Sequence, residues 1–201
     1  MAIAAGCPTL FLIAGPNGAG KTTFYDTVLK ARVNAPFVNA DIIQRDELRD
    51  PSLDAAYTAA RIAGERREEY IRQGASFVME TVFSHPSKLE LLASARDAGF
   101  RLIVFHLNVA TPDLAVARVK ARISEGGHEV PEHKIRERFE RNQALIRQAA
   151  LMADRALVFD SSALNERPRV LLELRQGRAV RIGDDLPDWF LALYAHPDMR
   201  D

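Results

Sequence analysis

The residues best suited to chemistry form one glycine-rich octapeptide, Gly15-Pro16-Asn17-Gly18-Ala19-Gly20-Lys21-Thr22. It matches the phosphate-binding loop pattern G-x-x-x-x-G-K-[ST] at every fixed position. In such a loop backbone N–H groups surround a polyphosphate, the lysine brings a positive charge to the β and γ phosphates, and the last hydroxyl is a ligand for Mg²⁺. These residues and the adjoining Thr23 are therefore the candidate nucleotide site, with ATP and Mg²⁺ as expected ligands.

The sequence on either side supports this interpretation. Residues 10–14 are an apolar run that predicts a buried strand, and residues 23–32 carry apolar side chains at helical spacing. A strand, a glycine-rich turn and a helix N-terminus together form an anion site from backbone dipoles. A chance glycine-rich turn is the alternative, and the flanking pattern disfavours it.

Three carboxylates follow other apolar runs: Asp41, Glu80 and Asp160. The ligand crevice of an open α/β sheet lies beyond the carboxyl ends of its strands, so all three acids are expected near Lys21. Phosphoryl transfer needs a group that accepts the proton of the attacking hydroxyl, and Asp41 is our candidate. Each acid also fits a helix N-cap or a turn, and this alternative is strongest for Asp160.

Arginines gather in residues 112–145, which we expect to form a helical lid. Two of them are four residues apart and share one helix face, and three more follow a loop that contains Gly126, Gly127 and His128: Arg118, Arg122, Arg136, Arg138 and Arg141. A guanidinium grips phosphate oxygens through two hydrogen bonds, so helices hinged at the glycines could close cations over a transferring phosphoryl group. The alternative is a solvated charged hairpin, with Glu132, Glu137 and Glu140 as counter-ions.

Alternating strands and helices must position these residues. Apolar runs at residues 37–38, 77–79, 102–105 and 156–159 predict further buried strands. Amphipathic patterns at residues 54–73, 86–98, 111–124 and 131–152 predict helices, the first with Arg61–Glu65 and Glu68–Arg72 pairs. We expect one domain over residues 1–201, a three-layer α/β P-loop kinase fold with a mainly parallel sheet. Residues 169–195 are expected to add a hairpin that turns at Gln176-Gly177, and a helix with Trp189.

Composition narrows the class of protein. The chain has 201 residues with 27 basic and 27 acidic side chains, so its zero net charge gives no field that would attract nucleic acid. The single cysteine, Cys7, fits a reducing compartment, and the histidines show no zinc spacing. No apolar run is long enough to span a membrane, and the N-terminus lacks the basic segment of a signal peptide. We expect a cytoplasmic protein without a membrane partner.

Taken in order, these residues resemble the zeta toxin family, P-loop kinases that phosphorylate UDP-N-acetylglucosamine on a sugar hydroxyl. The resemblance spans residues 9–162, and the short Gly-Gly-His lid is similar to a compact chromosomal branch. It rests on the phosphate loop, on Asn39-Ala40-Asp41, on Glu80-Thr81 with Ser84, and on the stretch from Arg122 to Pro131 and Arg136.

The resemblance implies roles for single residues. Lys21 binds phosphate, Thr22 binds Mg²⁺ and Asp41 is the catalytic base. The lid arginines are Arg122 and Arg136, with Arg118, Arg138 and Arg141 as alternatives within the same alignment. The acceptor side is formed by Asp41, Glu80, Thr81 and Ser84, and Asp160-Ser161-Ser162 is similar to the nucleobase-side turn. A nucleotide-sugar acceptor and an antitoxin protein are the partners that it implies.

Two other classes of function stay open. A regulatory NTPase would hydrolyse ATP to switch a protein or RNA partner, with Asp160 as its metal-binding acid, and a binding module would hold nucleotide without chemistry. The chain lacks the Asn-Lys-x-Asp guanine motif and the Leu-Ser-Gly-Gly-Gln signature. An arginine lid suits the exclusion of water from a transfer reaction. The favoured prediction is an ATP-dependent kinase that acts on a hydroxyl of a small molecule.

Overall fold

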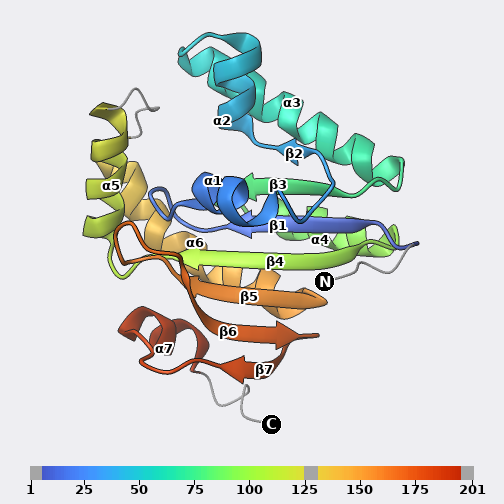
Figure 1. Ribbon diagram of the computed structural model, residues 1–201. Coiled ribbons are helices and arrows are strands. Elements are labelled where there is room, and N and C mark those ends of the chain that lie inside the picture. Colours follow the sequence, from blue (N-terminus) through green and yellow to red (C-terminus); the bar gives the residue numbers. More distant parts are fainter. Residues whose placement is uncertain (1–5, 125–130, 196–201) are drawn as a thin grey trace.

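The computed structural model describes residues 6–124 and 131–195, which form a seven-stranded sheet in the order β2-β3-β1-β4-β5-β6-β7 (Figure 1). β1 to β5 are parallel to one another, whereas β6 pairs antiparallel with β5 and β7 pairs antiparallel with β6. The strands are β1 (Thr9–Ala14), β2 (Phe37–Val38), β3 (Phe77–Thr81), β4 (Arg101–Asn108), β5 (Arg155–Asp160), β6 (Arg169–Arg175) and β7 (Arg178–Ile182). The predicted mainly parallel sheet is confirmed.

Helices cover both faces of this sheet, as the three-layer prediction requires. Their bounds are α1 (Lys21–Phe24), η1 (Tyr25–Leu29), α2 (Ala40–Ile42), η2 (Ile43–Leu48), α3 (Leu53–Arg72), α4 (Ser87–Asp97), α5 (Pro112–Ser124), α6 (Glu132–Met152) and α7 (Asp188–Tyr194), where η marks π-helical turns. Alternate residues of β1 point to opposite faces. Leu10 and Leu12 belong to a core shared with α3, α4, α6 and α7, and Phe11 and Ile13 to one shared with α1, η1 and α5.

The predicted helix after the phosphate loop is shorter than expected. It passes from α1 into a π-helical turn, closed by the bond from Lys30 N to Tyr25 O, and ends at Leu29 instead of residue 32. Tyr25 stacks on Phe37 with ring centroids 3.7 Å apart, so the chain leaves the helix close to the start of β2. Because the helix ends at Leu29, a short connection is enough to reach β2, which begins at Phe37.

The C-terminal segment folds as predicted, into a hairpin and a helix. Gln176 and Gly177 both have positive φ, at 49° and 76°, as a two-residue hairpin turn requires. α7 packs on the sheet through Phe190 and Tyr194, which are both buried. In the part of the chain that the structure describes, no helix is both long and apolar enough to cross a lipid bilayer.

Candidate active site

The phosphate loop connects β1 to α1, and its glycines are needed because other backbone passes close to it. A Cβ on Gly15 would lie 2.0 Å from the carbonyl oxygen of Leu107, and one on Gly18 would lie 2.6 Å from that of Ala115. Gly18 and Gly20 also have φ of 77° and 76°, in the left-handed region. The β4–α5 backbone therefore presses against the loop and leaves no room for side chains at two of its positions.

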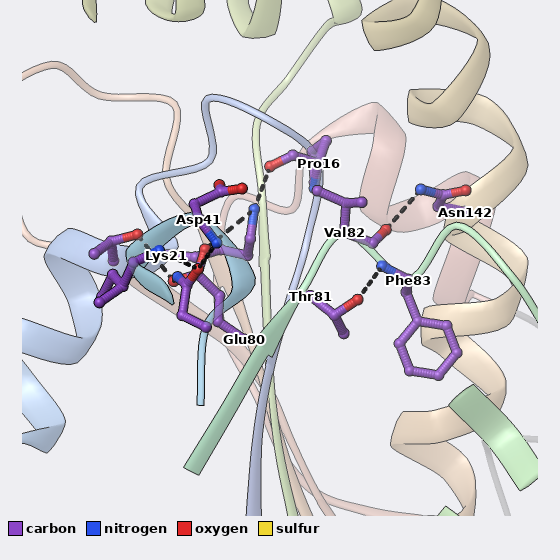
Figure 2. Close-up of polar contacts among 11 residues, drawn as sticks. Pro16, Lys21, Asp41, Glu80, Thr81, Val82, Phe83 and Asn142 are labelled. Carbon is purple, nitrogen blue, oxygen red and sulfur yellow. Dashed lines mark hydrogen bonds and ion pairs between the residues drawn. The ribbon is translucent and has the colours of Figure 1, made fainter. Parts of the chain in front are cut away.

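Lys21 lies buried at the start of α1, with 6% of its surface exposed. Its Nζ donates a hydrogen bond to the Pro16 carbonyl at 2.9 Å, so the side chain folds back over its own loop (Figure 2). Burial lowers the pKa of Lys21, and the negative charges of Glu80 and Asp41 partly offset that effect. The positive charge of Arg122 also lowers the Lys21 pKa, which places that arginine within electrostatic reach of the loop.

Glu80 joins three elements at the carboxyl edge of the sheet. Its Oε2 accepts hydrogen bonds from Thr22 Oγ1 at 2.9 Å and from Asn39 Nδ2 at 2.8 Å, and its Oε1 lies 3.9 Å from Lys21 Nζ. Burial raises the pKa of this carboxyl, and the nearby Lys21 charge opposes that rise. We predicted that Glu80 follows the strand. Instead it lies inside β3, where it pairs with Ile13 of β1. Its buried carboxylate therefore ties the loop, α1 and the end of β2 together.

Asp41 lies in the first turn of α2 and does not cap that helix. The cap is Asn39, whose Oδ1 accepts from the backbone N–H groups of Asp41 at 2.8 Å and Ile42 at 3.3 Å. The Asp41 carboxylate is exposed, and Figure 2 shows it beside Lys21 and Glu80, on whose pKa values its charge acts. The capping alternative for Asp41 is therefore wrong, and the carboxylate stays available at the rim of the loop.

The other predicted acceptor-side residues lie just after Glu80. Thr81 Oγ1 accepts a hydrogen bond from the Phe83 backbone N–H at 3.0 Å, and Asn142 Nδ2 of α6 donates to the Val82 carbonyl at 2.6 Å (Figure 2). These bonds hold the turn at Phe83, which has a φ of 58°. Ser84, half-buried, follows this turn. Sequence reasoning did not identify Asn142, because an asparagine inside a long amphipathic helix carries no motif.

The remaining loop residues include one buried polar atom without a partner. Asn17 Oδ1 is buried and forms no hydrogen bond within the part of the chain that the structure describes, while Ala19 is fully buried and Thr23 is exposed at the start of α1. An orphaned polar atom is rare in folded proteins and marks a site that a bound group can complete. It lies between the two glycines that backbone contacts hold in place, as expected for a loop shaped around a ligand.

The predicted lid arginines have different surroundings. Arg136 forms ion pairs with Asp113 at 2.6 Å and with Glu132 at 2.8 Å, which links α5 to α6. Arg118 donates to the carbonyls of residues 161, 162 and 163, so it holds the β5–β6 loop and is not a free lid cation. Arg141 pairs with Glu137. Gly126, Gly127 and His128, the predicted hinge, lie outside the described residues.

Asp160 ends β5 and is engaged within its own turn. Its Oδ1 accepts from both the backbone N–H and the hydroxyl of Ser162, and its Oδ2 lies 3.7 Å from an Arg169 nitrogen. These contacts support the turn interpretation over a metal-binding one. The adjacent Ser161 side chain lies 3.6 Å from where a Cβ on Gly20 would stand, so this turn flanks the phosphate loop.

Hard oxygen donors at the loop fit a magnesium ion. The Thr22 hydroxyl and the Glu80 carboxylate are adjacent, and oxygen ligands of this kind suit Mg²⁺, which also keeps waters and substrate phosphates as ligands. Among residues 6–124 and 131–195, no group of three or more His, Cys, Asp or Glu side chains could hold a metal without such help. The donor set therefore fits a metal that arrives with a nucleotide.

Comparison with known proteins agrees with this geometry. A family model described as Zeta toxin matches residues 3–167. An uncharacterized protein of Haemophilus influenzae is 27% identical over 129 residues, which covers 62% of this chain and 88% of the relative.

Two solved structures share the fold at low identity. A structure of AvrRxo1-ORF1:-ORF2 with ATP has a TM-score of 0.63 at 17% identity, over 86% of this chain but only 60% of the matched chain. The PezAT chromosomal toxin–antitoxin system of Streptococcus pneumoniae has a TM-score of 0.59 at 16% identity, over 79% of this chain and 70% of that one. Because the family model covers most of the sequence, including every element of the phosphate-loop site, this chain belongs to the Zeta toxin family.

Proposed function

We propose that this chain is an ATP-dependent kinase that transfers the γ-phosphate to a hydroxyl group of a small molecule. The observation that carries the proposal is the buried Glu80 carboxylate. It contacts Thr22 and Asn39 and lies 3.9 Å from Lys21, and it thereby sets the phosphate loop against the end of β2, where Asp41 stands. A loop for phosphates and an exposed carboxylate beside it are the two parts that a phosphoryl transfer to an alcohol requires.

Lys21 and the loop would hold and polarise the phosphates. Among the described residues, Nζ has the Pro16 carbonyl as its close partner and lies 3.9 Å from Glu80, so it can turn toward β and γ oxygens without breaking a short ion pair. Mg²⁺, held by the Thr22 hydroxyl beside Glu80, would neutralise part of the phosphate charge. The AvrRxo1 structure with ATP, similar in fold, makes ATP the nucleotide that we propose.

Asp41 is the group that we propose as catalytic base. Its carboxylate would accept the proton of the acceptor hydroxyl as the hydroxyl oxygen bonds to the γ-phosphorus and the bond from that phosphorus to the bridging oxygen breaks. Asn39 fixes the backbone of Asp41 through its cap, so the chain that carries this carboxylate is positioned before the acceptor binds. Thr81 and Ser84 are proposed to line the acceptor side, and Arg122 and Arg136 to close over the phosphates.

The family suggests a nucleotide sugar, of the UDP-N-acetylglucosamine type, as the acceptor. Its toxin–antitoxin relative PezAT suggests an antitoxin as a protein partner. The alternative is a regulatory NTPase that acts on a protein or RNA. The engagement of Asp160 with Ser162 and Arg169 weakens this alternative, because the acid that would hold the metal is already occupied.

A screen of acceptors tests the proposal. The purified chain is incubated with γ-labelled ATP, Mg²⁺ and panels of nucleotide sugars, nucleosides and amino sugars, and label is followed into the small-molecule fraction. The Lys21→Ala variant is the matched control for contaminating kinases. Label transfer to an acceptor by the wild type alone supports the kinase. Hydrolysis to free phosphate with every acceptor class would favour the NTPase.

A further inference from the structure

Arg67, on α3, is a buried cation that forms no ion pair with an acidic side chain of residues 6–124 or 131–195. Only 8% of its surface is exposed, and its Nε is buried without a hydrogen-bond partner. Its guanidinium folds back along the helix, because a Cβ on Gly64 would lie 3.8 Å from one of its terminal nitrogens. Burying an uncompensated charge is costly, so such a group needs an explanation.

The other arginines of the same region show that this is specific to Arg67. Arg61, Arg66 and Arg72 are exposed or half-buried, and each has its own carboxylate partner, within 2.6 Å at the longest. The more exposed arginines of this region, which water already solvates, are therefore paired with carboxylates, whereas the buried guanidinium of Arg67 has no such partner among the described residues. Glu68, next to Arg67 in sequence, acts on it only through its charge, from an exposed position.

Arg67 lines a groove of about 540 Å³ between α3 and α4, both labelled in Figure 1. Lys88, in the first turn of α4, lines the same groove and is half-buried, and neither cation forms an ion pair with any carboxylate of the described residues. Burial, and then the Arg67 charge, lower the pKa of Lys88, so the two cations act on each other. The groove is also lined by hydroxyls and apolar side chains, from Ser87, Ser94, Ile71 and Leu91, and by the exposed carboxylates of Glu68 and Glu90.

We propose that this α3–α4 groove binds the phosphate group of a small phosphorylated molecule. A phosphate monoester carries a charge of about −1.5 to −2 at neutral pH, which suits the buried Arg67 guanidinium and the half-buried Lys88 ammonium together, while the groove's carboxylates, Glu68 and Glu90, are exposed. The planar fork of Arg67 suits two phosphate oxygens. The positive end of the 11-residue helix α4 adds to the attraction at Lys88. Ile71 and Leu91 would contact the organic part.

The groove is separate from the phosphate loop. The charges that act on Lys21 are those of Glu80, Asp41 and Arg122, whereas the charge that acts on Lys88 is that of Arg67. The groove also extends along α3 and α4 to Arg72 and Ser94, away from the carboxyl edge of the sheet. A ligand bound here would therefore act alongside the nucleotide and would not replace it, and the inference does not depend on the kinase proposal.

Calorimetry on the full chain tests the site, with phenyl phosphate and inorganic phosphate as probes. The Lys21→Ala background removes the main phosphate cation of the loop. On this background, Arg67→Met should raise the Kd for phenyl phosphate by about 10-fold to 100-fold, the range expected for lost charge-assisted hydrogen bonds. Arg61→Met, which removes a paired exposed arginine of the same helix, should leave that Kd unchanged. Lys88→Met should weaken binding in the same direction as Arg67→Met.

Thermal melting without phosphate separates a binding role from a structural one. Because the substitution removes an unpaired buried charge, Arg67→Met should keep or raise the Tm. Equal Kd values with and without Arg67 would overturn the proposal, as would the absence of saturable binding. Loss of Tm in Arg67→Met with an unchanged Kd in Lys88→Met would also overturn it. Inorganic phosphate binding as tightly as phenyl phosphate would overturn the assignment to an organic phosphate.

Discussion

His106 should make the stability of the protein depend on pH between neutral and mildly acidic conditions. It lies on β4, fully buried, with Nδ1 2.8 Å from the Tyr194 hydroxyl of α7. Burial lowers its pKa from the ordinary 6.5 to about 3. The folded protein therefore keeps the ring neutral at mildly acidic pH, where the unfolded chain takes up a proton.

The sign and size follow from proton linkage. Below a pH of about 6.5 the unfolded state binds one more proton at this site, so stability falls as pH falls toward the folded pKa of about 3. Between about pH 7.5 and about pH 5.5 the loss is about 1.4 kcal/mol. For a chain of this size that corresponds to a drop of roughly 3–6 °C in Tm. Glu80 acts in the opposite direction, because burial raises its pKa and protonation then favours the folded state.

Melting curves of three proteins at these two pH values isolate the histidine. His106→Gln cannot titrate but can still hydrogen-bond Tyr194, so it should lose roughly 3–6 °C less than the wild type on acidification. His133→Gln, exposed on α6, is the matched control and should follow the wild type. If the Tm of His106→Gln and the Tm of the wild type fall by the same amount, the neutral buried ring is not the source of the pH dependence.

Four further predictions concern the phosphate-loop site. Gly18→Ala should weaken ATP binding and lower stability by about 1–3 kcal/mol, because φ is positive and Ala115 leaves no room; calorimetry and melting measure both. Lys21→Ala should abolish transfer while the circular dichroism spectrum is unchanged, and wild-type turnover would contradict the loop assignment. Glu80→Gln should lower kcat by roughly 10²-fold, since it keeps the shape but removes the charge that orders the loop. Arg122→Ala and Arg136→Ala should each lower kcat by roughly 10²-fold with a smaller effect on ATP binding, and a loss of Tm alone would favour the charged-hairpin alternative.

The fold was largely predictable from sequence because its strands are buried on both faces. Continuous apolar runs located the parallel strands β1 to β5, and the Gln176-Gly177 turn located the hairpin. The π-helical turns η1 and η2 were not predicted, because their sequences carry no signal that distinguishes them from α-helix. Local pairing was predicted only in part: Arg61 pairs with Glu65 as expected, whereas Arg72 pairs with Glu69 and not with Glu68.

The residues of the candidate site that belong to a sequence motif could be predicted, whereas those that only the fold brings together could not. The phosphate loop and the acid Glu80 meet as predicted, because strand ends converge at one edge of a parallel sheet. Other features could not be predicted. The backbone contacts of Arg118 and the burial of His106 depend on residues more than 40 positions away in the sequence. The cap at Asn39 depends on competition between neighbouring polar side chains, and residue spacing does not tell which of them caps the helix. The catalytic roles of Asp41, Arg122 and Arg136 stay predictions.

Transfer of the γ-phosphate by an Asp41→Asn variant tests the central claim most directly. Label from γ-labelled ATP is followed into UDP-N-acetylglucosamine, or into the acceptor that the screen identifies, while nucleotide binding is measured by calorimetry. Because Asn39 caps α2, the substitution leaves the helix cap intact and removes only the carboxylate. We predict ATP binding within a few-fold of wild type and a kcat lower by ~10²–10⁴. An Asp41→Asn enzyme that transfers phosphate at the wild-type rate would contradict the proposed mechanism.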